Sequence, residues 1–135
     1  MLKIVLGVIA GFVAWSVLWL GTDQVLIMAS PGWYGAHQGS FELAMATQQP
    51  FSPDATILIM HLARAALISV MSGFLAAFIA NENRRTPLIL GVLLLAFGLM
   101  VEVTTWNYLP IWYHLVFLAM LIPFTVLGGK IKRTA

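Results

Sequence analysis

One stretch of the chain, residues 55–80, constrains the fold more than any other, because it is apolar over a length that crosses a lipid bilayer. Its only ionisable side chains are those of His61 and Arg64. At about 1.5 Å per residue, a helix over this stretch spans the roughly 30 Å hydrocarbon core of a membrane. Because hydrocarbon cannot hydrogen-bond to an open backbone, the stretch is predicted to be a transmembrane helix.

Small side chains recur along one face of this predicted helix. They stand four residues apart, with others beside them: Ala65, Ser69, Gly73 and Ala77, flanked by Ser72, Ala76 and Ala80. In a bilayer, such faces let helices approach closely and gain van der Waals contact. At about 100° per residue, His61 projects over the same face and Arg64 lies at its flank. Both side chains are therefore expected to face protein and not lipid.

The composition extends this interpretation to the whole chain. Of the 135 residues, 61% are hydrophobic and 9% are charged, whereas soluble domains contain roughly 25% charged residues. At about 20 apolar residues per crossing, there is room for four membrane helices in one domain. We expect an all-α, integral membrane four-helix transmembrane bundle over residues 1–135, with helices at about residues 4–29, 55–80, 87–106 and 111–128.

The polar interval between the first two predicted helices, residues 30–54, is expected to be an outer loop. It is rich in glycine and aromatic residues, and residues 41–49 are predicted to form a short interfacial helix capped by Ser40. A Ser-Pro-Asp sequence at residues 52–54 then supplies a cap residue, a proline for the first helical position and an acid for the first turn. The central helix is predicted to begin there.

Basic residues predict the orientation of the bundle. All of them except Arg64 fall on one side of a four-crossing arrangement: Lys3, Arg84, Arg85, Lys130, Lys132 and Arg133. By the positive-inside rule this side is cytoplasmic. We therefore expect a multi-pass protein of the plasma (inner) membrane with both termini in the cytoplasm. Because these residues act as topology signals, no nucleic-acid partner is expected.

Ionisable side chains from all four helices are expected at one depth in the outer leaflet: Asp23, His61, Arg64, Glu102 and His114. Arg64 and Glu102 each stand about 25 Å above the cytoplasmic boundary at the helical rise per residue. A charge that faces lipid near the bilayer centre costs about 2.5–3.5 kcal/mol, so these side chains are expected to face inward. Arg64 and Glu102 are predicted to form a buried ion pair that sets helix register. The alternative is that all five side chains contact a ligand, ion or proton.

The histidines raise a metal-site hypothesis. Imidazole and carboxylate groups suit zinc, iron or copper, so His37, His61 and His114, with Asp23 or Glu102, are candidate ligands. No HxxxH or ExxH spacing supports this site, and ordinary hydrogen-bonded histidines are the alternative. The chain has no cysteine, which excludes disulfides, thiolate catalysis and cysteine-based metal sites. The sequence requires no cofactor and identifies none. Aromatic residues at the outer ends of the last two helices are interpreted as an interfacial belt: Trp106, Tyr108, Trp112 and Tyr113.

Three classes of function fit these features. The preferred hypothesis is a non-enzymatic accessory or assembly component, or a self-associating membrane protein, in which the polar layer is structural. Gly7 and Gly11 form a GxxxG pattern that packs against a neighbouring helix or a second copy. The second class is a small transporter, channel or outward-facing ligand- or ion-binding protein that uses the outer polar layer. The third is a metal- or quinone-linked membrane enzyme. The expected partners are the lipid bilayer and a homo-oligomer or larger membrane complex.

Overall fold

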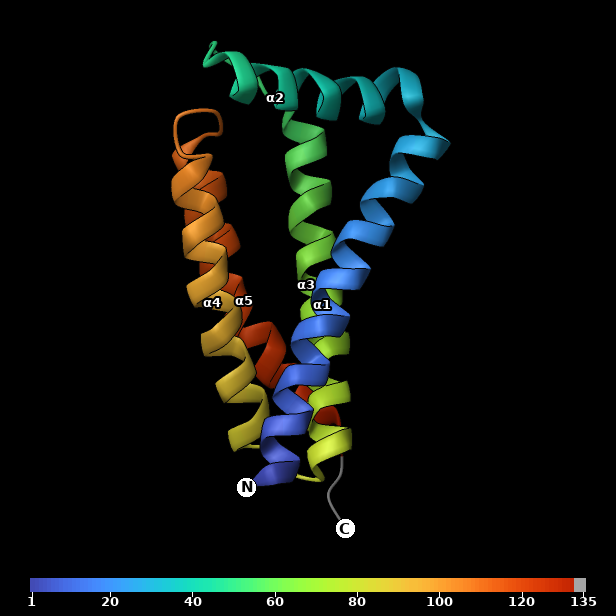
Figure 1. The fold of residues 1–135 in the computed structure, drawn as a ribbon, viewed down its shortest axis with the longest axis vertical. Coiled ribbons are helices and arrows are strands. Elements are labelled where there is room, and N and C mark those ends of the chain that lie inside the picture. The colour runs from blue at the N-terminus through green and yellow to red at the C-terminus, as the bar shows by residue number, and fades with distance from the viewer. Residues whose placement is uncertain (133–135) are drawn as a thin grey trace.

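Four long apolar helices make up most of the structure, a computed structural model that describes residues 1–132 (Figure 1). They are α1 (Leu2–Ala29), α3 (Ala55–Ala80), α4 (Arg85–Thr104) and α5 (Ile111–Ile131). Each is long and apolar enough to cross a membrane. Between α1 and α3, a short π-helix, η1 (Pro31–Gly35), leads into α2 (Ala36–Thr47). The structure therefore confirms the all-α transmembrane bundle expected from the sequence.

The two ends of the bundle differ. The start of α1, the connection from α3 to α4 and the end of α5 lie together at one end, which we call the terminal end (Figure 1). At the other end, the α2 end, α2 lies across the bundle at a steep angle to the long helices. The basic residues Lys3, Arg84, Arg85, Lys130 and Lys132 belong to segments at the terminal end, whereas Arg133 lies outside the described residues. Which side of the membrane each end faces stays a prediction from the positive-inside rule.

The helix predicted within residues 41–49 is longer than expected, and its proposed cap is wrong. Because η1 runs directly into α2, the N–H groups near Ser40 already have helical partners, and Ser40 lies inside α2. α3 begins at Ala55, in agreement with the predicted range 55–80, but its cap differs from the one that the Ser-Pro-Asp pattern predicted. Asp54 is its N-cap, and the carboxylate accepts a hydrogen bond of 2.8 Å from the backbone N–H of Thr56. Ser52 therefore precedes the helix.

Close backbone contact joins the helices in the terminal half. The small residues of α3 that the sequence singled out are buried. A Cβ on Gly73 would overlap the carbonyl oxygen of Thr125 on α5, and one on Gly128 would overlap that of Val70 on α3. On α1, a Cβ on Gly7 would lie 2.5 Å from the carbonyl oxygen of Ala76. Glycine allows these approaches because it carries no side chain.

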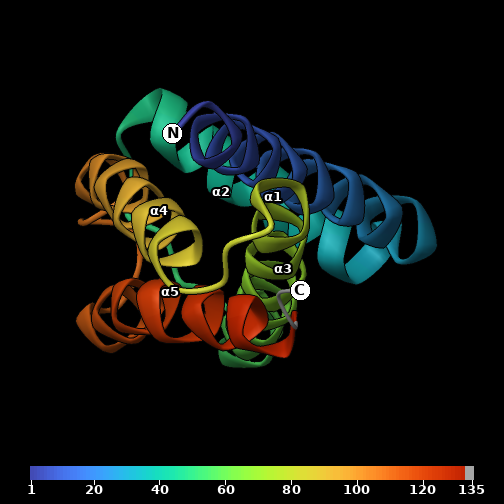
Figure 2. The ribbon, with the colours of Figure 1, turned by 90° about the horizontal axis from the view of Figure 1, so that it is seen from below.

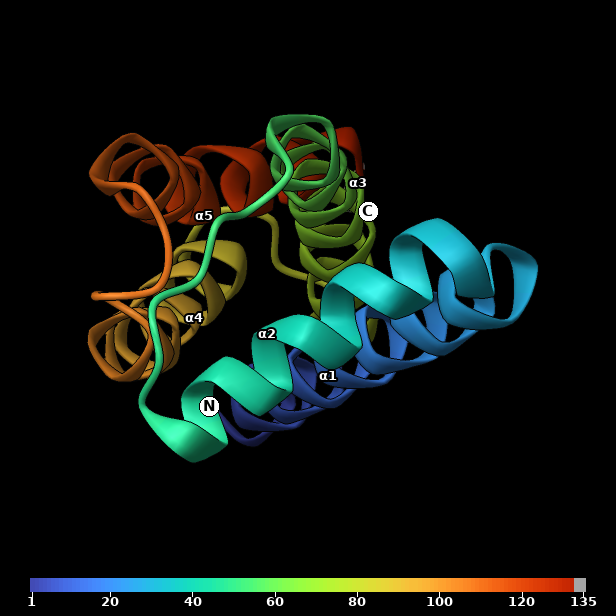
Figure 3. The same cartoon turned by 90° about the horizontal axis from the view of Figure 1, so that it is seen from above.

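The four long helices follow one another around the bundle in the order α1, α3, α5, α4 (Figure 2). Of the neighbouring pairs, α1 and α4 contact each other least. Seen from the α2 end, α2 lies in front of α1, and residues 48–54 cross the bundle to reach α3 (Figure 3). The α2 end is therefore crossed by a returning segment.

Candidate ligand-binding pocket

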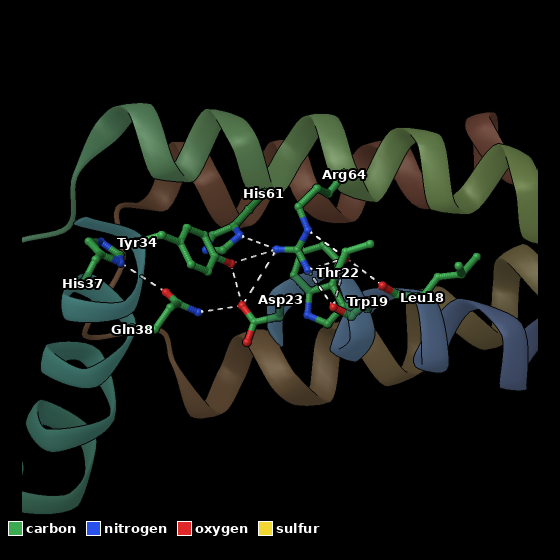
Figure 4. Close-up of polar contacts among 9 residues, drawn as sticks. All are labelled: Leu18, Trp19, Thr22, Asp23, Tyr34, His37, Gln38, His61 and Arg64. Carbon is green, nitrogen blue, oxygen red and sulfur yellow. Dashed lines mark hydrogen bonds and ion pairs between the residues drawn. The ribbon is translucent and has the colours of Figure 1, made fainter. Parts of the chain in front are cut away.

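Arg64 of α3 joins three elements at the α2 end (Figure 4). Its Nη2 donates to the backbone carbonyl of Trp19 at 2.6 Å, and both Nε and Nη2 donate to Oγ1 of Thr22 on α1. Its Nη1 donates to Oη of Tyr34 on η1 at 3.0 Å and to Nδ1 of His61 at 3.0 Å. A guanidinium carries five N–H donors. All five are therefore occupied, and Arg64 has no donor left for a ligand.

Asp23 is the acidic partner of Arg64, and Tyr34 links the two side chains by hydrogen bonds. The Arg64–Asp23 ion pair is long, at 4.0 Å between Nη1 and Oδ1. Tyr34 bridges the two groups, because its hydroxyl accepts from Arg64 and donates to Oδ1 of Asp23 at 2.5 Å. Burial of Tyr34, together with its hydrogen bond to Asp23, raises the pKa of this phenol, so it keeps its proton at neutral pH. Gln38 of α2 donates to the same carboxylate oxygen at 3.1 Å.

The ion pair predicted between Arg64 and Glu102 is therefore wrong. The two residues have matching depths, but Arg64 turns toward α1, and Glu102 of α4 pairs with His114 of α5. The arrangement of the helices determines which partner each residue meets, since α1 lies next to α3 and α5 lies next to α4. Glu102 and His114 are 3% and 0% exposed.

The Glu102–His114 pair shares one proton. Nδ1 of His114 contacts Oε2 of Glu102, and Nε2 lies 3.3 Å from the backbone carbonyl of Trp106, to which it donates. The Trp106 ring stacks on the imidazole with centroids 4.5 Å apart. Nε2 of His114 carries its own proton, and one further proton lies between Nδ1 of His114 and Oε2 of Glu102. The pair therefore has no net charge. Oε1 of Glu102 carries no proton in either arrangement and remains an acceptor.

Two further contacts fasten η1 and α2 to the start of α3. The indole Nε1 of Trp33 donates to Oδ2 of Asp54 at 3.0 Å. Nε2 of His37 accepts from the backbone N–H of Asp54 at 3.1 Å, and its Nδ1 donates to Oε1 of Gln38. Both nitrogens of His37 therefore have partners inside the chain.

Acid is expected to release Trp33 from Asp54. The hydrogen bond from Trp33, followed by the one from the Thr56 backbone, lowers the pKa of Asp54 below its ordinary 3.8. The contact is therefore complete above pH 3.8 and is lost as the pH falls through this lowered pKa. The indole N–H resonance of Trp33, assigned with Trp33→Phe, should shift in that acid range. In Asp54→Asn, the same resonance should show no acid transition; a transition that persists would contradict this assignment.

An apolar cavity of about 360 Å³ lies in the α2 half, between the four long helices and below α2. Aromatic rings form much of its wall: Phe12, Trp15 and Trp19 from α1, Phe97 from α4, and Tyr113 and Phe117 from α5. Trp15 and Trp19 stack with centroids 5.3 Å apart, and Phe117 meets Trp19 edge-on at 5.9 Å. His37, Gln38 and Phe41 of α2 contribute to the lining at the top. This volume lies in the range of small-molecule sites.

Four buried residues with polar side chains line this cavity: His61, Tyr113, Glu102 and Thr105, which are 7%, 4%, 3% and 7% exposed. The hydroxyl of Thr105 bonds to backbone carbonyls of its own helix. Because a guanidinium only donates, Nδ1 of His61 accepts from Arg64, and the proton of the ring is on Nε2. Within residues 1–132, Nε2 of His61, Oη of Tyr113 and Oε1 of Glu102 have no hydrogen-bond partner. None of these atoms is sealed in protein, and each belongs to a residue that lines the cavity.

The structure thus divides the five residues that the sequence proposed for ligand binding. His61 and Glu102 line the cavity, whereas Asp23, Arg64 and His114 bind other parts of the chain and support the walls. Tyr113 was missed, because its place beside Trp112 is typical of an interfacial belt. Trp112 is 44% exposed, as that interpretation expects, but Tyr113 turns inward. Only the orientation of α5 within the bundle distinguishes Tyr113 from Trp112.

The proposed metal site is not assembled in the part of the chain that the structure describes. Nowhere in residues 1–132 do three or more histidine, aspartate or glutamate side chains come close enough together to hold an ion. His37 contacts Gln38 and Asp54, His61 contacts Arg64, and His114 contacts Glu102. His37 and His61 lie at the two ends of one hydrogen-bond network that runs through other side chains: Gln38, Asp23, Tyr34 and Arg64. His114 belongs to a separate pair, so the three imidazoles do not converge on one point.

Comparison with family models, with curated proteins and with solved structures finds no match to this chain. The residues that line the cavity are therefore the features of this protein that indicate a function. What is established is a small multi-pass membrane protein with four apolar helices.

Proposed function

We propose that this protein binds a neutral, largely apolar molecule dissolved in the membrane, and that the cavity below α2 is the binding site. One observation carries the proposal: an aromatic-walled space of about 360 Å³ is lined by buried residues with polar atoms that have no hydrogen-bond partner within residues 1–132. Small-molecule sites typically combine apolar walls with a few polar groups that orient the ligand. A buried polar group without a partner costs about 1–3 kcal/mol, so a ligand that supplied partners would gain affinity.

The ligand is proposed to enter from the side, between α1 and α4. The back wall is closed, since Leu58, His61 and Leu121 are at most 7% exposed. The rim residues Leu20 of α1 and Val101 of α4 are 65% and 50% exposed. In Figure 1, α1 leans away from α4 toward the α2 end. With the terminal end in the cytoplasm, this opening would face the outer leaflet of the membrane.

The charged groups around the cavity are paired with one another, which favours a neutral ligand. Arg64 is compensated by Asp23 and has no free donor, and the Glu102–His114 pair is neutral overall. The site therefore offers no unpaired charge to hold an ion. The close glycine contacts of α1, α3 and α5 in the terminal half also argue against a path through the bundle. Binding fits this arrangement better than conduction.

The accessory or self-associating role that the sequence favoured has less support than binding. It depended on small-residue faces that would bind a partner helix. Those faces are used inside the chain: Gly7 and Gly11 pack against Ala76 and Leu90, and Gly73 packs against Thr125. These glycines are therefore not available to a second protein, and we propose the cavity as the functional site.

Filling the cavity should abolish binding. Ser16 lines the cavity, and its hydroxyl bonds only to its own helix, whereas Val17 beside it is 62% exposed and lies outside the lining. Native mass spectrometry of protein released gently from its membrane should show a retained small molecule in the wild type and in Val17→Phe. We expect Ser16→Phe to reduce its occupancy at least tenfold. A wild-type protein that carries a foreign subunit and no small molecule would overturn the proposal in favour of the accessory role.

A further inference from the structure

The polar atoms that face the cavity define the headgroup of the ligand. This inference rests on the proposed function, because it concerns the same cavity. His61 offers one donor through Nε2, since its Nδ1 accepts from Arg64. Glu102 offers one acceptor through Oε1, since the proton of the Glu102–His114 pair lies between Oε2 and Nδ1. The cavity therefore presents both hydrogen-bonding functions, each fixed by a contact behind it.

Tyr113 lies close to His61 and to the Glu102–His114 pair. Its ring centroid is 6.3 Å from that of His61 and 6.0 Å from that of His114, the partner of Glu102. Its hydroxyl can donate or accept and has no partner within residues 1–132. The donor, the acceptor and this adaptable hydroxyl thus belong to neighbouring side chains on three helices, α3, α4 and α5. The Trp19 ring packs beside the His61 imidazole, with centroids 5.6 Å apart, so these polar side chains adjoin an aromatic surface.

We propose that the ligand is a hydroxyl-bearing neutral lipid, a molecule with an apolar body and an alcohol headgroup next to His61, Tyr113 and Glu102. An alcohol can accept from His61 and donate to Glu102 or Tyr113. A carbonyl headgroup, such as that of a quinone, only accepts and leaves Oε1 of Glu102 without a donor. A carboxylate headgroup would lie beside the acceptor Glu102 with no free cation to compensate it. A hydrocarbon would leave both groups unsatisfied, which is costly in a buried site.

Three matched probes test this headgroup: 12-bromododecan-1-ol, its methyl ether and 1-bromododecane. They differ in offering a donor and an acceptor, an acceptor alone, or neither. Bromine quenches tryptophan fluorescence, and Trp15 and Trp19 line the cavity. Quenching is measured in lipid nanodiscs at equal probe fractions in the bilayer, and quenching of Ser16→Phe is subtracted as the contribution from lipid. We expect the alcohol to bind about fivefold more tightly than the ether, and the ether about fivefold more tightly than the bromoalkane, one net hydrogen bond at each step.

The outcomes separate the two proposals. If no probe quenches the wild type more than Ser16→Phe, the cavity is not a binding site and both proposals fail. If all three probes bind equally, or if the ether equals the alcohol, the binding site stands and the hydroxyl headgroup is overturned.

A conservative pair of variants locates the headgroup. Tyr113→Phe removes a hydroxyl that bonds to nothing in the described chain, so the fold should persist. It should weaken alcohol binding several-fold and leave bromoalkane binding unchanged. Tyr108→Phe makes the same chemical change outside the cavity lining and should alter neither. An alcohol preference that is unchanged in Tyr113→Phe would overturn the placement of the headgroup beside this residue.

Discussion

Gly73→Ala is expected to lower the free energy of unfolding by about 3 kcal/mol, near the upper end of the cost of overpacking a core. The added methyl group would overlap the carbonyl oxygen and neighbouring backbone atoms of Thr125. A long side chain can turn away from such an overlap, but backbone cannot. The whole of α5 must therefore move away from α3, and the reciprocal contact of Gly128 with Val70 must open with it.

The control for this variant is Gly21→Ala on α1, where a Cβ would meet nothing within 4 Å. Alanine is the better helix former by about 0.5–1 kcal/mol, so this variant should be neutral or slightly more stable than the wild type. Denaturant unfolding in bicelles, followed by circular dichroism, compares the two variants. Equal stability of Gly73→Ala and Gly21→Ala would mean that α3 and α5 do not cross as closely as the structure shows.

Arg64→Gln is expected to cost about 3 kcal/mol, because it breaks a partly buried ion pair together with the hydrogen bonds of the guanidinium and leaves the partner charge uncompensated. The Arg64 side chain is 12% exposed, and its guanidinium lies 4.1 Å from the centroid of the Trp19 ring. Loss of the guanidinium removes the hydrogen bonds to α1 and η1 and leaves the Asp23 carboxylate without its cationic partner. Arg64→Lys should recover part of the loss, since lysine keeps the charge but cannot form five bonds in a planar fork. Arg84→Gln, at an exposed arginine of the terminal end, should have little effect.

Double-mutant cycles decide which acid compensates Arg64. Arg64→Gln combined with Asp23→Asn should show a coupling energy of about 1 kcal/mol, because the two side chains share one network. Combined with Glu102→Gln, it should be additive within about 0.5 kcal/mol, as for residues without shared partners. The reverse pattern of couplings would restore the Arg64–Glu102 pair that the sequence predicted.

The Arg64–Glu102 prediction failed for a specific physical reason. The rise of a helix is fixed, so the depth of a residue in the membrane can be calculated from the sequence. The direction in which a side chain turns depends on which helices are neighbours, and nothing in residues 55–80 names them. Arg64 could have met either of two acids at a similar level, Asp23 or Glu102. The order α1, α3, α5, α4 selected Asp23 for Arg64 and His114 for Glu102.

The inward orientation of Tyr113 is a second feature that the sequence did not predict. In a soluble protein, an alternation of polar and apolar residues indicates which face of a helix is buried. In a membrane helix, lipid and protein interior are both apolar, so this signal is nearly absent. Tyr113 and Trp112 are neighbours of similar character, yet one lines the cavity and the other is exposed. Small residues are the exception, because close helix contact requires them, and the buried face of α3 was predicted correctly.

The sequence by itself determined the number of membrane crossings, the buried small-residue face of α3 and the inward layer of ionisable side chains. Each follows from a strong and local physical cost: open backbone in hydrocarbon, bulk at a helix contact, or charge in lipid. Only the tertiary structure decided the partners within that layer, the return of η1 and α2 over the bundle, and the divergence of α1 from α4. These depend on how helices with similar apolar surfaces arrange around one another, and the cavity with its three polar atoms exists only as a result of that arrangement.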